Sequence, residues 1–247
     1  MKKQLISFLI CVTSGVTSAL YLAEDPKFPY RKPDKTANRS PCPVLNALAN
    51  HGYLPREGTG ITMDQLKGAF TMAFNLDESV TVAVSKLGFT TSTTGNPNTL
   101  NLKDLSKHNV MEHDGSLSRA DSVTGDANSF NEQIWKTVKA RFTGQTIDTK
   151  TMALARRERL VAAMAANPKF NLTSIQVRAS AEESAFILGV LAGNFQNPQA
   201  PTQYMTIMFE EERIPFNEGF KTSPNKIFAE QIVSLATDLL RNTPPMC

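Results

Sequence analysis

The stretch RSPCPVLNALANHGYLPREG, residues 39–58, decides what kind of fold we expect for this chain. A cysteine lies between two prolines at residues 41–43, and the apolar side chains that follow recur at helical spacing up to Gly52. Proline suits the first helical position because its ring fixes φ and because the amide hydrogen it lacks would be unpaired there. We therefore predict a helix from Pro43 to Ala49 with Cys42 as its N-cap.

The position of Cys42 predicts a reactive sulfur. Backbone N–H groups at the start of a helix point at the capping side chain and favour negative charge, which lowers the pKa of a thiol. Such a thiolate could act as a nucleophile or as a metal ligand. The alternative is a buried cysteine that serves as a small apolar side chain, and the tripeptide alone does not decide between the two.

The other residues of the chain limit which chemical role the sulfur of Cys42 can have. A cysteine hydrolase needs a histidine base, for which the chain offers His51, His108 and His113. A zinc site needs several thiol and imidazole ligands, which three cysteines and three histidines make difficult to assemble. A haem iron needs only one cysteine, because the porphyrin supplies four ligands.

The first 19 residues have the pattern of a secretory signal peptide. Lys2 and Lys3 precede a short apolar run over residues 5–12, and small residues follow at 17–19. This run is far shorter than the roughly 20 residues that a membrane span needs, and no other stretch is long and apolar enough. We therefore expect a secreted, extracellular protein that does not span a membrane.

The expected export bears on charge, glycosylation and the remaining cysteines. Loss of the two lysines lowers the formal net charge from +3 to about +1, which argues against a nucleic-acid partner. Asn38 and Asn171 begin glycosylation sequons. Cys11 leaves with the signal peptide, and Cys247 ends a tail with two prolines. We expect Cys247 to form an interchain disulfide, giving a possible homodimer.

The spacing of apolar residues predicts an all-α, single-domain fold with little strand. Residues 20–40 are expected to form an extended N-terminal arm, residues 41–241 the domain and residues 242–247 the tail. Capping signals and helical periodicity predict further helices over residues 62–74, 78–87, 102–108, 129–142, 149–166, 180–192 and 225–241. The best candidate strand is Tyr204 to Phe209.

Three short motifs, taken in order, resemble one family. Pro41-Cys42-Pro43 is followed by Glu112-His113-Asp114 and then by Ser180-Ala181-Glu182-Glu183. Together they resemble the PCP–EHD–S–E signature of the short members of the haem-thiolate peroxidase family, which contains chloroperoxidase and the unspecific peroxygenases. The likeness extends from Arg39 to about Phe220. It implies a helical haem-thiolate peroxidase fold, haem b as cofactor and hydrogen peroxide as oxidant.

The resemblance implies a role for the cysteine and for one glutamate. Cys42 would be the axial ligand of the haem iron, and electron donation from its thiolate would favour cleavage of the O–O bond. A glutamate would be the acid–base catalyst, and the family spacing selects Glu183 over Glu182. On a helical wheel Glu183 also shares an apolar stripe with Phe186 and Ile187, whereas Glu182 lies at its edge. The alternative is that Ser180-x-x-Glu183 is a capping box.

Residues of the second motif would support the catalyst and hold a cation. By resemblance, His113 would orient Glu183 and count with it as catalytic. Glu112 and Ser116, joined by the carbonyl of His113, would bind Mg²⁺ or Mn²⁺, since hard oxygen ligands suit magnesium. We expect Asp114 to cap its own turn. The alternative is a surface histidine in an ordinary polar loop.

The sequence says less about the substrate pocket and the remaining charged residues. Phe186, one turn beyond Glu183, is expected to line the pocket, and weaker candidates are Phe74, Met111 and Ile187. His51 is expected to be structural and His108 exposed. The run Arg156-Arg157-Glu158-Arg159 is expected to be the solvated side of its helix.

These features favour a secreted haem-thiolate peroxygenase that uses hydrogen peroxide to oxygenate small apolar organic substrates. The first alternative is a chloride or bromide haloperoxidase on the same scaffold. The second is a haem-free secreted interaction protein.

Overall fold

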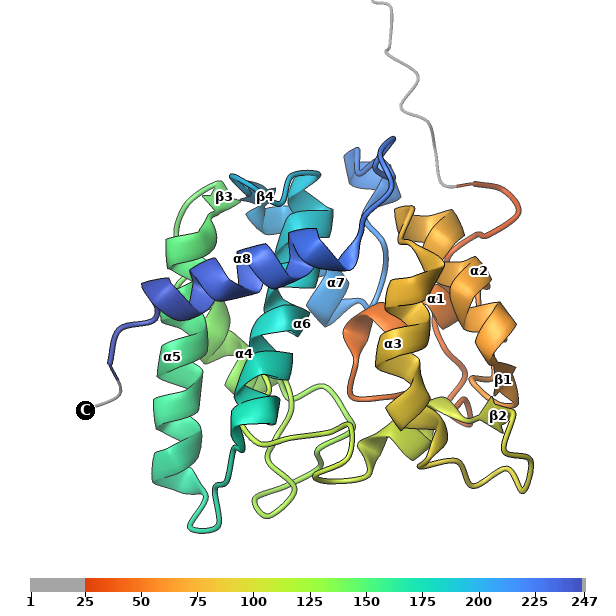
Figure 1. Cartoon of the computed structure of the whole chain (residues 1–247), viewed down its shortest axis with the longest axis horizontal. Helices are drawn as coiled ribbons and strands as arrows, with labels where there is room; N and C mark the ends of the chain where they lie inside the picture. The colour runs from red at the N-terminus through yellow and green to blue at the C-terminus, as the bar shows by residue number, and fades with distance from the viewer. Residues whose placement is uncertain (1–24, 246–247) are drawn as a thin grey trace, which may run out of the picture.

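The computed structural model describes residues 25–245. The expected signal peptide and Cys247 lie outside these residues, and so does the beginning of the expected arm. Within them the chain is mostly helical, as predicted, and the elements follow one another from α1 at Cys42 to α8 near the C-terminus (Figure 1). The helices are α1 (Pro43–His51), α2 (Met63–Phe74), α3 (Glu78–Phe89), α4 (Glu132–Lys139), α5 (Thr149–Ala166), α6 (Ser174–Ala192), α7 (Thr202–Glu210) and α8 (Ala229–Asn242).

Short elements complete the fold. β1 (Ile61–Thr62) pairs antiparallel with β2 (Thr99–Leu100), and β3 (Thr146–Ile147) pairs antiparallel with β4 (Ala200–Pro201). Two 3₁₀ helices, η1 (Leu102–Ser106) and η2 (Phe216–Glu218), lie in the connections.

The helix signals in the sequence act as expected at several termini. Thr62 caps α2 in a reciprocal box with Gln65, and α1 ends at Gly52, whose φ of +83° is one that glycine adopts without strain. Asp148 caps α5, which spans the predicted residues. Local side-chain chemistry therefore accounts for these boundaries.

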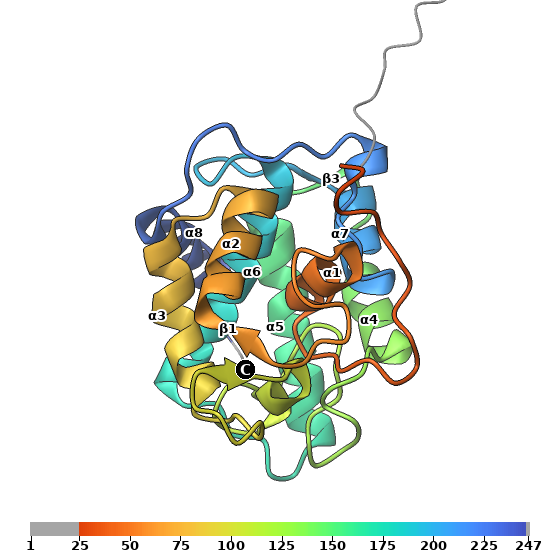
Figure 2. The same ribbon diagram turned by 90° about the vertical axis from the view of Figure 1, so that its right-hand side faces the viewer.

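The helices form two groups around a shared core. α8 lies across α5 and α6 at one end of the molecule, while α2 and α3 pack together at the other (Figure 1). From the side, α1 lies between α2 and α7 and contacts both (Figure 2). One cluster of buried apolar side chains runs through these helices, with Leu48 and Leu188 fully buried. The helix that begins at Cys42 is thus central.

Several sequence predictions about secondary structure are wrong. The helix predicted for residues 102–108 is only the 3₁₀ helix η1, and the helices predicted from residues 129 and 225 begin at Glu132 and Ala229. Residues 204–209, predicted as a strand, belong to helix α7 (Thr202–Glu210), where tertiary contacts with α1 and α6 outweigh the weak strand propensity of the segment. Helix α6 begins at Ser174, well before the predicted start, because Thr173 and Gln176 form its capping box. Ser180 and Glu183 therefore lie inside the helix, and the capping-box alternative for them is excluded.

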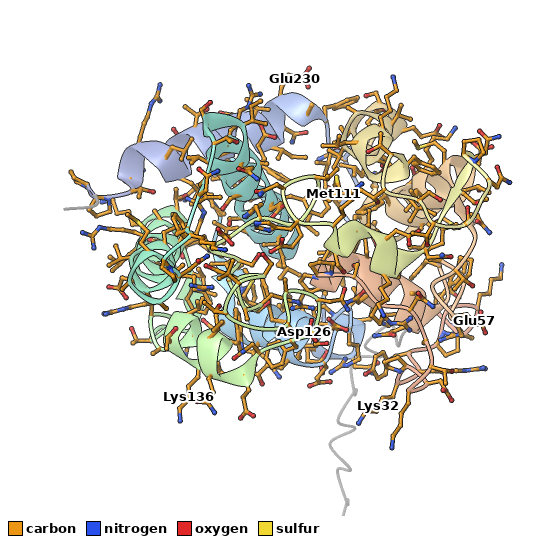
Figure 3. All side chains as sticks on the ribbon, turned by 90° about the horizontal axis from the view of Figure 1, so that it is seen from below. Lys32, Glu57, Met111, Asp126, Lys136 and Glu230 are labelled. Carbon is orange, nitrogen blue, oxygen red and sulfur yellow. The ribbon has the colours of Figure 1, made fainter. Side chains whose placement is uncertain are left out.

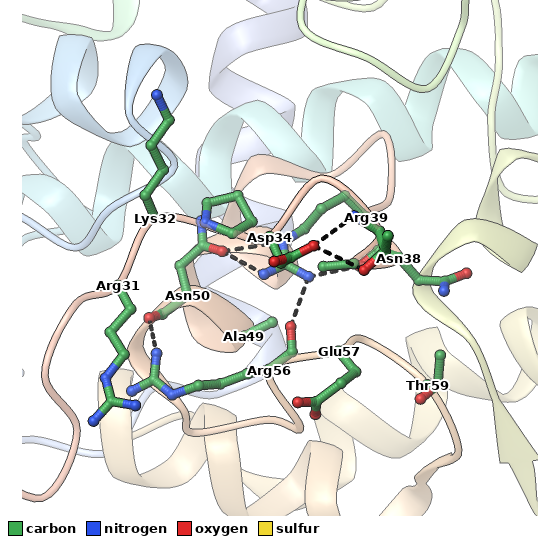
Figure 4. A pocket seen from close by; sticks show the side chains of 13 residues that line it. Arg31, Lys32, Asp34, Asn38, Arg39, Ala49, Asn50, Arg56, Glu57 and Thr59 are labelled. Atoms are coloured by element: carbon green, nitrogen blue, oxygen red, sulfur yellow. Dashed lines mark hydrogen bonds between the residues drawn. The ribbon is translucent and has the colours of Figure 1, made fainter.

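The described part of the arm, residues 25–40, contains neither helix nor strand and runs along α1 and the loop that follows it. Between them is a cavity of about 300 Å³, lined largely by polar and charged residues (Figure 4). Arg39 donates to the side-chain oxygen of Asn50 and to the carbonyls of Asn38 and Arg56. The guanidinium of Arg56 donates to the carbonyl of Pro29. These arginines fasten the arm to the body of the protein.

Over residues 25–245 no helix combines the length and the apolar character that crossing a membrane requires.

Candidate active site

Cys42 occupies the position that the sequence predicts. It is the N-cap of α1 in extended conformation, with Pro43 in the first turn, and its carbonyl accepts the amide of Asn46 at 3.2 Å. The sulfur makes no cap hydrogen bond of normal distance and angle, yet the amides of Leu45 and Val44 are close enough to lower its pKa. In the part of the chain that the structure describes, Cys42 is a free cysteine.

The pKa predicted for this thiol is wrong in direction. Burial raises the pKa of Cys42 to about 11, and this effect outweighs the helix amides and the positive charge of Arg119, which lower it. The negative charge of Glu183 raises the pKa further. Without a bound metal, the side chain of Cys42 is therefore a protonated thiol at neutral pH. A positively charged metal bound to the sulfur would displace the proton, because metal ligands are deprotonated.

His113 and Glu183 meet as the resemblance implies. Nε2 of His113 lies 3.6 Å from a carboxylate oxygen of Glu183, and its Nδ1 donates to the carbonyl of Asp114 at 2.8 Å. Burial lowers the pKa of His113, but the carboxylates of Glu183 and Glu112 and the Asp114 carbonyl outweigh burial and raise it to about 9. His113 is therefore an imidazolium at neutral pH, with an N–H on each side.

The burial predicted for Glu183 is not observed. Its side chain is 67% exposed, although that of His113 is only 5% exposed. The apolar stripe on which the helical wheel placed Glu183 is itself divided, because Ile187 is buried and Phe186 is only partly so. Glu182 points elsewhere and pairs with Arg178 at 2.7 Å. Of the two neighbouring glutamates, Glu183 is the one paired with His113.

The candidate cation ligands all belong to the loop before α4. One carboxylate oxygen of Glu112 is 2.6 Å from Nδ1 of His108, and its other oxygen is buried without a hydrogen-bond partner among the described residues. Ser116 donates to the carbonyl of His113 at 3.3 Å. These groups offer oxygen atoms, whereas the described chain has no cluster of three or more His, Cys, Asp and Glu side chains arranged for a metal. A cation here would depend on carbonyl and hydroxyl oxygens in addition to the carboxylate of Glu112.

Two predictions about this loop are corrected. His108 is partly buried, with 32% of its side chain exposed, because it pairs with Glu112. Asp114 does not cap its own turn: one oxygen accepts the amide of Asn171 at 3.1 Å, and the other is buried without a partner among the described residues. Asp121 caps the turn instead, by accepting the amide of Gly115 at 3.0 Å.

The aromatic side chains near Glu183 form a cluster that the sequence analysis found in part. The ring of Phe186 lies 6.1 Å from those of Phe70 and Phe74, measured between centroids. Phe74 and Ile187 are buried, at 1% and 5% exposed. Phe186, Phe70 and Met111 are partly buried. Met111 lies on the loop that crosses the underside of the molecule (Figure 3).

Sequence reasoning missed two buried arginines. Arg156 and Arg159, expected on the solvated side of α5, are only 3% and 6% exposed. Arg159 pairs with the buried carboxylate of Asp121 at 2.8 Å. Arg156 donates to Ser180 at 3.1 Å, its Nε has no partner among the described residues, and its pKa is lowered to about 10 by burial, an effect that the charge of Glu183 opposes. Charge runs on a helix do not reveal such burial.

The model of one protein family, peroxidase family 2, matches residues 28–225, which is most of the chain. The chain belongs to peroxidase family 2. The match includes Cys42, the Glu112-His113-Asp114 loop and Glu183. The resemblance found from three short motifs is thus confirmed at the level of the family.

Individual relatives agree with the family. The chain is 38% identical over 114 residues to a chloroperoxidase of Leptoxyphium fumago, an alignment that covers 44% of the chain and 31% of that protein. It is 31% identical over 170 residues to an aromatic peroxygenase of Coprinellus radians, covering 60% and 64%. An aromatic peroxygenase of Cyclocybe aegerita is 27% identical over 218 residues, covering 80% and 59%. The chain thus spans less than two thirds of the length of these relatives.

The chemistry of the residues at the family site fits a haem. Cys42 supplies a free thiol at a helix N-terminus, and one sulfur is enough to hold a haem iron because the porphyrin supplies the other ligands. Glu183 is exposed although His113 beside it is buried. Glu112 contributes a buried oxygen that lacks a hydrogen-bond donor among the described residues.

Proposed function

We propose that this protein is a haem-thiolate peroxygenase that uses hydrogen peroxide to oxygenate small apolar organic molecules. The observation that carries the proposal is the pairing of Glu183 with the buried His113, in a site where the charge of Glu183 also acts on the thiol of Cys42. Haem b would be held through the sulfur of Cys42. When bound, haem supplies the redox chemistry, and a thiolate ligand favours cleavage of the O–O bond.

The proton transfers of the reaction would fall to Glu183. Its carboxylate takes the proton from one oxygen of hydrogen peroxide and returns it to the other, which leaves as water. The imidazolium of His113, 3.6 Å away, holds the carboxylate of Glu183 in place for the proton transfer. The fixed bond from Nδ1 of His113 to the carbonyl of Asp114 sets the direction in which the other ring nitrogen points.

A magnesium ion, or manganese in its place, would bind beside the haem. The free oxygen of Glu112, the hydroxyl of Ser116 and the carbonyl of His113 are the expected ligands, and their chemistry supports this assignment. Such a cation would satisfy the buried oxygen that has no hydrogen-bond donor in the described chain.

The substrate would meet Phe186, Phe70 and Met111, which are apolar and partly exposed. Two relatives are named aromatic peroxygenases, and flat apolar substrates suit a wall of phenylalanine rings. The second candidate function is halide oxidation, because the relative with 38% identity is named a chloroperoxidase. Product analysis with an aromatic substrate and a halide acceptor, each with hydrogen peroxide, separates the two.

Secretion, glycosylation and dimerisation remain part of the proposal. Asn171 is exposed and Asn38 partly so, which leaves both asparagines of the sequons accessible. Intact mass before and after deglycosylation tests the first two features together. A non-reducing gel of the wild type beside Cys247→Ser tests the interchain disulfide, and a wild type that runs only as monomer excludes it.

The decisive experiment for the function compares Glu183→Gln with Glu182→Gln. We expect Glu183→Gln to bind haem but to turn over peroxide roughly 10²–10⁴-fold more slowly, the range attributed to a positioned acid–base group. Glu182 pairs with Arg178, so Glu182→Gln should retain activity. Equal loss in both variants would reject Glu183 as the catalyst. Cys42→Ala should lose the red-shifted band of the ferrous–CO complex, and a variant that keeps this band rejects the ligand.

A further inference from the structure

Helix α1, which carries Cys42 at its N-cap, has a buried polar face. Asn46, Asn50 and His51 are 1%, 1% and 0% exposed. Buried polar side chains are costly unless they are hydrogen-bonded, so each must have a specific partner. In a helix of nine residues, three such side chains are a large share. Their hydrogen bonds fix the position of the helix more exactly than apolar packing alone would.

Each of the three has one partner in the same loop, residues 211–214, which follows α7. The carboxylate of Glu212 accepts the side-chain amide of Asn46 at 2.8 Å, and the backbone carbonyl of Glu212 accepts that of Asn50 at 3.0 Å. The amide of Ile214 donates to Nε2 of His51 at 3.1 Å, so His51 is structural, as expected. A loop that is distant in sequence thus contacts all three polar side chains of α1.

Glu212 adopts an unusual backbone conformation to make these contacts. Its φ is +47°, in the left-handed region that residues other than glycine seldom occupy. This conformation lets the carbonyl and the carboxylate of one residue both reach α1. Strain of this kind persists only where the surrounding contacts determine it, and it is concentrated at functional sites.

The same carboxylate binds a buried positive charge. Nη2 of Arg119 lies 2.5 Å from the oxygen of Glu212 that Asn46 also contacts, and Arg119 is 1% exposed. The positive charge of Arg119 lowers the pKa of the Cys42 thiol. Glu212 therefore joins helix α1, which begins at Cys42, to the guanidinium of Arg119.

A chain of hydrogen bonds continues from Asn46 to the backbone of Cys42. The Asn46 side-chain oxygen accepts the amide of Ser40 at 2.8 Å, and its nitrogen donates to the carbonyl of Ser40 at 2.8 Å. The Ser40 hydroxyl in turn accepts the amide of Cys42 at 3.2 Å. Both polar atoms of the Asn46 side chain are thus used, and they join Glu212 to Ser40 and, through Ser40, to Cys42.

We propose that Glu212 is a positioning residue for the sulfur of Cys42: through Asn46 and Ser40 it sets the orientation of the N-cap, and through Arg119 it sets the charge beside it. This role rests on the proposed function, since it concerns how the sulfur meets a haem iron. Glu212 is not among the residues expected to touch haem or substrate. Residues that hydrogen-bond to a metal ligand without touching the metal orient that ligand and tune its electron donation.

The test compares Glu212→Gln with the neighbouring variant Glu211→Gln in the haem-loaded protein. Glu211 is a suitable control because its carboxylate is 50% exposed and pairs with Arg213 on the surface. We expect Glu212→Gln to lose haem to excess apomyoglobin roughly 10–100-fold faster than the wild type, the usual range for an outer-shell change. Its ferrous–CO complex should lose part of the thiolate band, and its reduction potential should rise because Arg119 is left without its counter-charge.

A purely structural role would lower the thermal midpoint and speed haem loss but leave the potential and the band unchanged, and that outcome overturns the inference. If Glu212→Gln matches Glu211→Gln in haem loss, band and potential, the inference is also overturned while the proposed function stands. If the wild type itself shows no thiolate band, the proposed function fails and this inference with it.

A second variant covers the case in which Glu212→Gln does not fold. Glu212→Asp keeps the charge, tolerates a left-handed φ and shortens the reach to Asn46 and Arg119. It should lose haem faster than both the wild type and Glu211→Gln and lose part of the thiolate band, while its potential stays near that of the wild type. A Glu212→Asp variant with an unchanged band would overturn the inference.

Discussion

The ion pair between His113 and Glu183 makes stability depend on pH in a defined window. The pKa of His113 rises from 6.5 to about 9 in the folded protein. A group whose pKa is raised by folding stabilises the folded state below its unfolded pKa and loses that contribution as pH rises through the folded value. We therefore expect the free energy of unfolding to fall between pH 6.5 and about 9.

The size of this change in the free energy of unfolding follows from the pKa shift of His113. A pKa change from 6.5 to about 9 corresponds to at most about 3–4 kcal/mol. Glu183 is 67% exposed, so solvent screens the pair and the expected contribution is smaller, about 1 kcal/mol. Chemical unfolding at pH 6.5 and at about pH 9, followed by circular dichroism, measures this difference directly.

Two variants isolate the pair. Glu183→Gln removes the charge that holds the proton on His113, so the difference between the two pH values should shrink towards zero. Glu182→Gln is the matched control, because Glu182 pairs with Arg178 and should leave the difference unchanged. A wild type whose stability is flat over this window, or a Glu182→Gln variant that shrinks the difference as much as Glu183→Gln does, would refute the reasoning.

Three further changes test the packing and charge of the fold. Gly189→Ala brings a methyl group well inside contact distance of the ring of Phe195, and should lower the free energy of unfolding by about 1–3 kcal/mol in a thermal melt. Arg159→Met leaves the carboxylate of Asp121 buried without its counter-charge, and should cost about 3–5 kcal/mol; a loss below about 1 kcal/mol would show that the pair is dispensable. Arg213 lowers the pKa of Glu218, so Glu218→Gln should flatten the loss of stability that denaturant titration measures as pH falls below 4.5.

Much of the helical architecture could be predicted because its signals are local. The N-cap at Cys42, the box at Thr62 and the span of α5 depend on neighbours within one turn. The strand predicted for residues 204–209 failed because that segment owes its helix to contacts with α1 and α6. The secondary-structure propensity of a short segment does not reflect its contacts with distant helices.

The candidate site was predictable in composition and less so in environment. The motifs identified Cys42, His113 and Glu183, and the structure brings His113 and Glu183 together. The exposure of Glu183 and the raised pKa of Cys42 depend on which side chains surround them after folding. The sequence analysis did not single out Arg156 or Glu212, because one lies in an ordinary charge run and the other among neighbouring acidic residues near the end of the family likeness. Their partners are distant in sequence.

The contacts of the arm have a practical consequence for anyone who shortens this protein. Nδ1 of His51 bonds to the carbonyl of Phe28, the guanidinium of Arg56 bonds to that of Pro29, and the amide of Arg31 bonds to the carbonyl of Asn50. A version trimmed to begin at the first motif would remove all three bonds from the rear of the cysteine helix and open that helix to water. Tags and cleavage sites therefore belong ahead of Phe28, where these bonds begin.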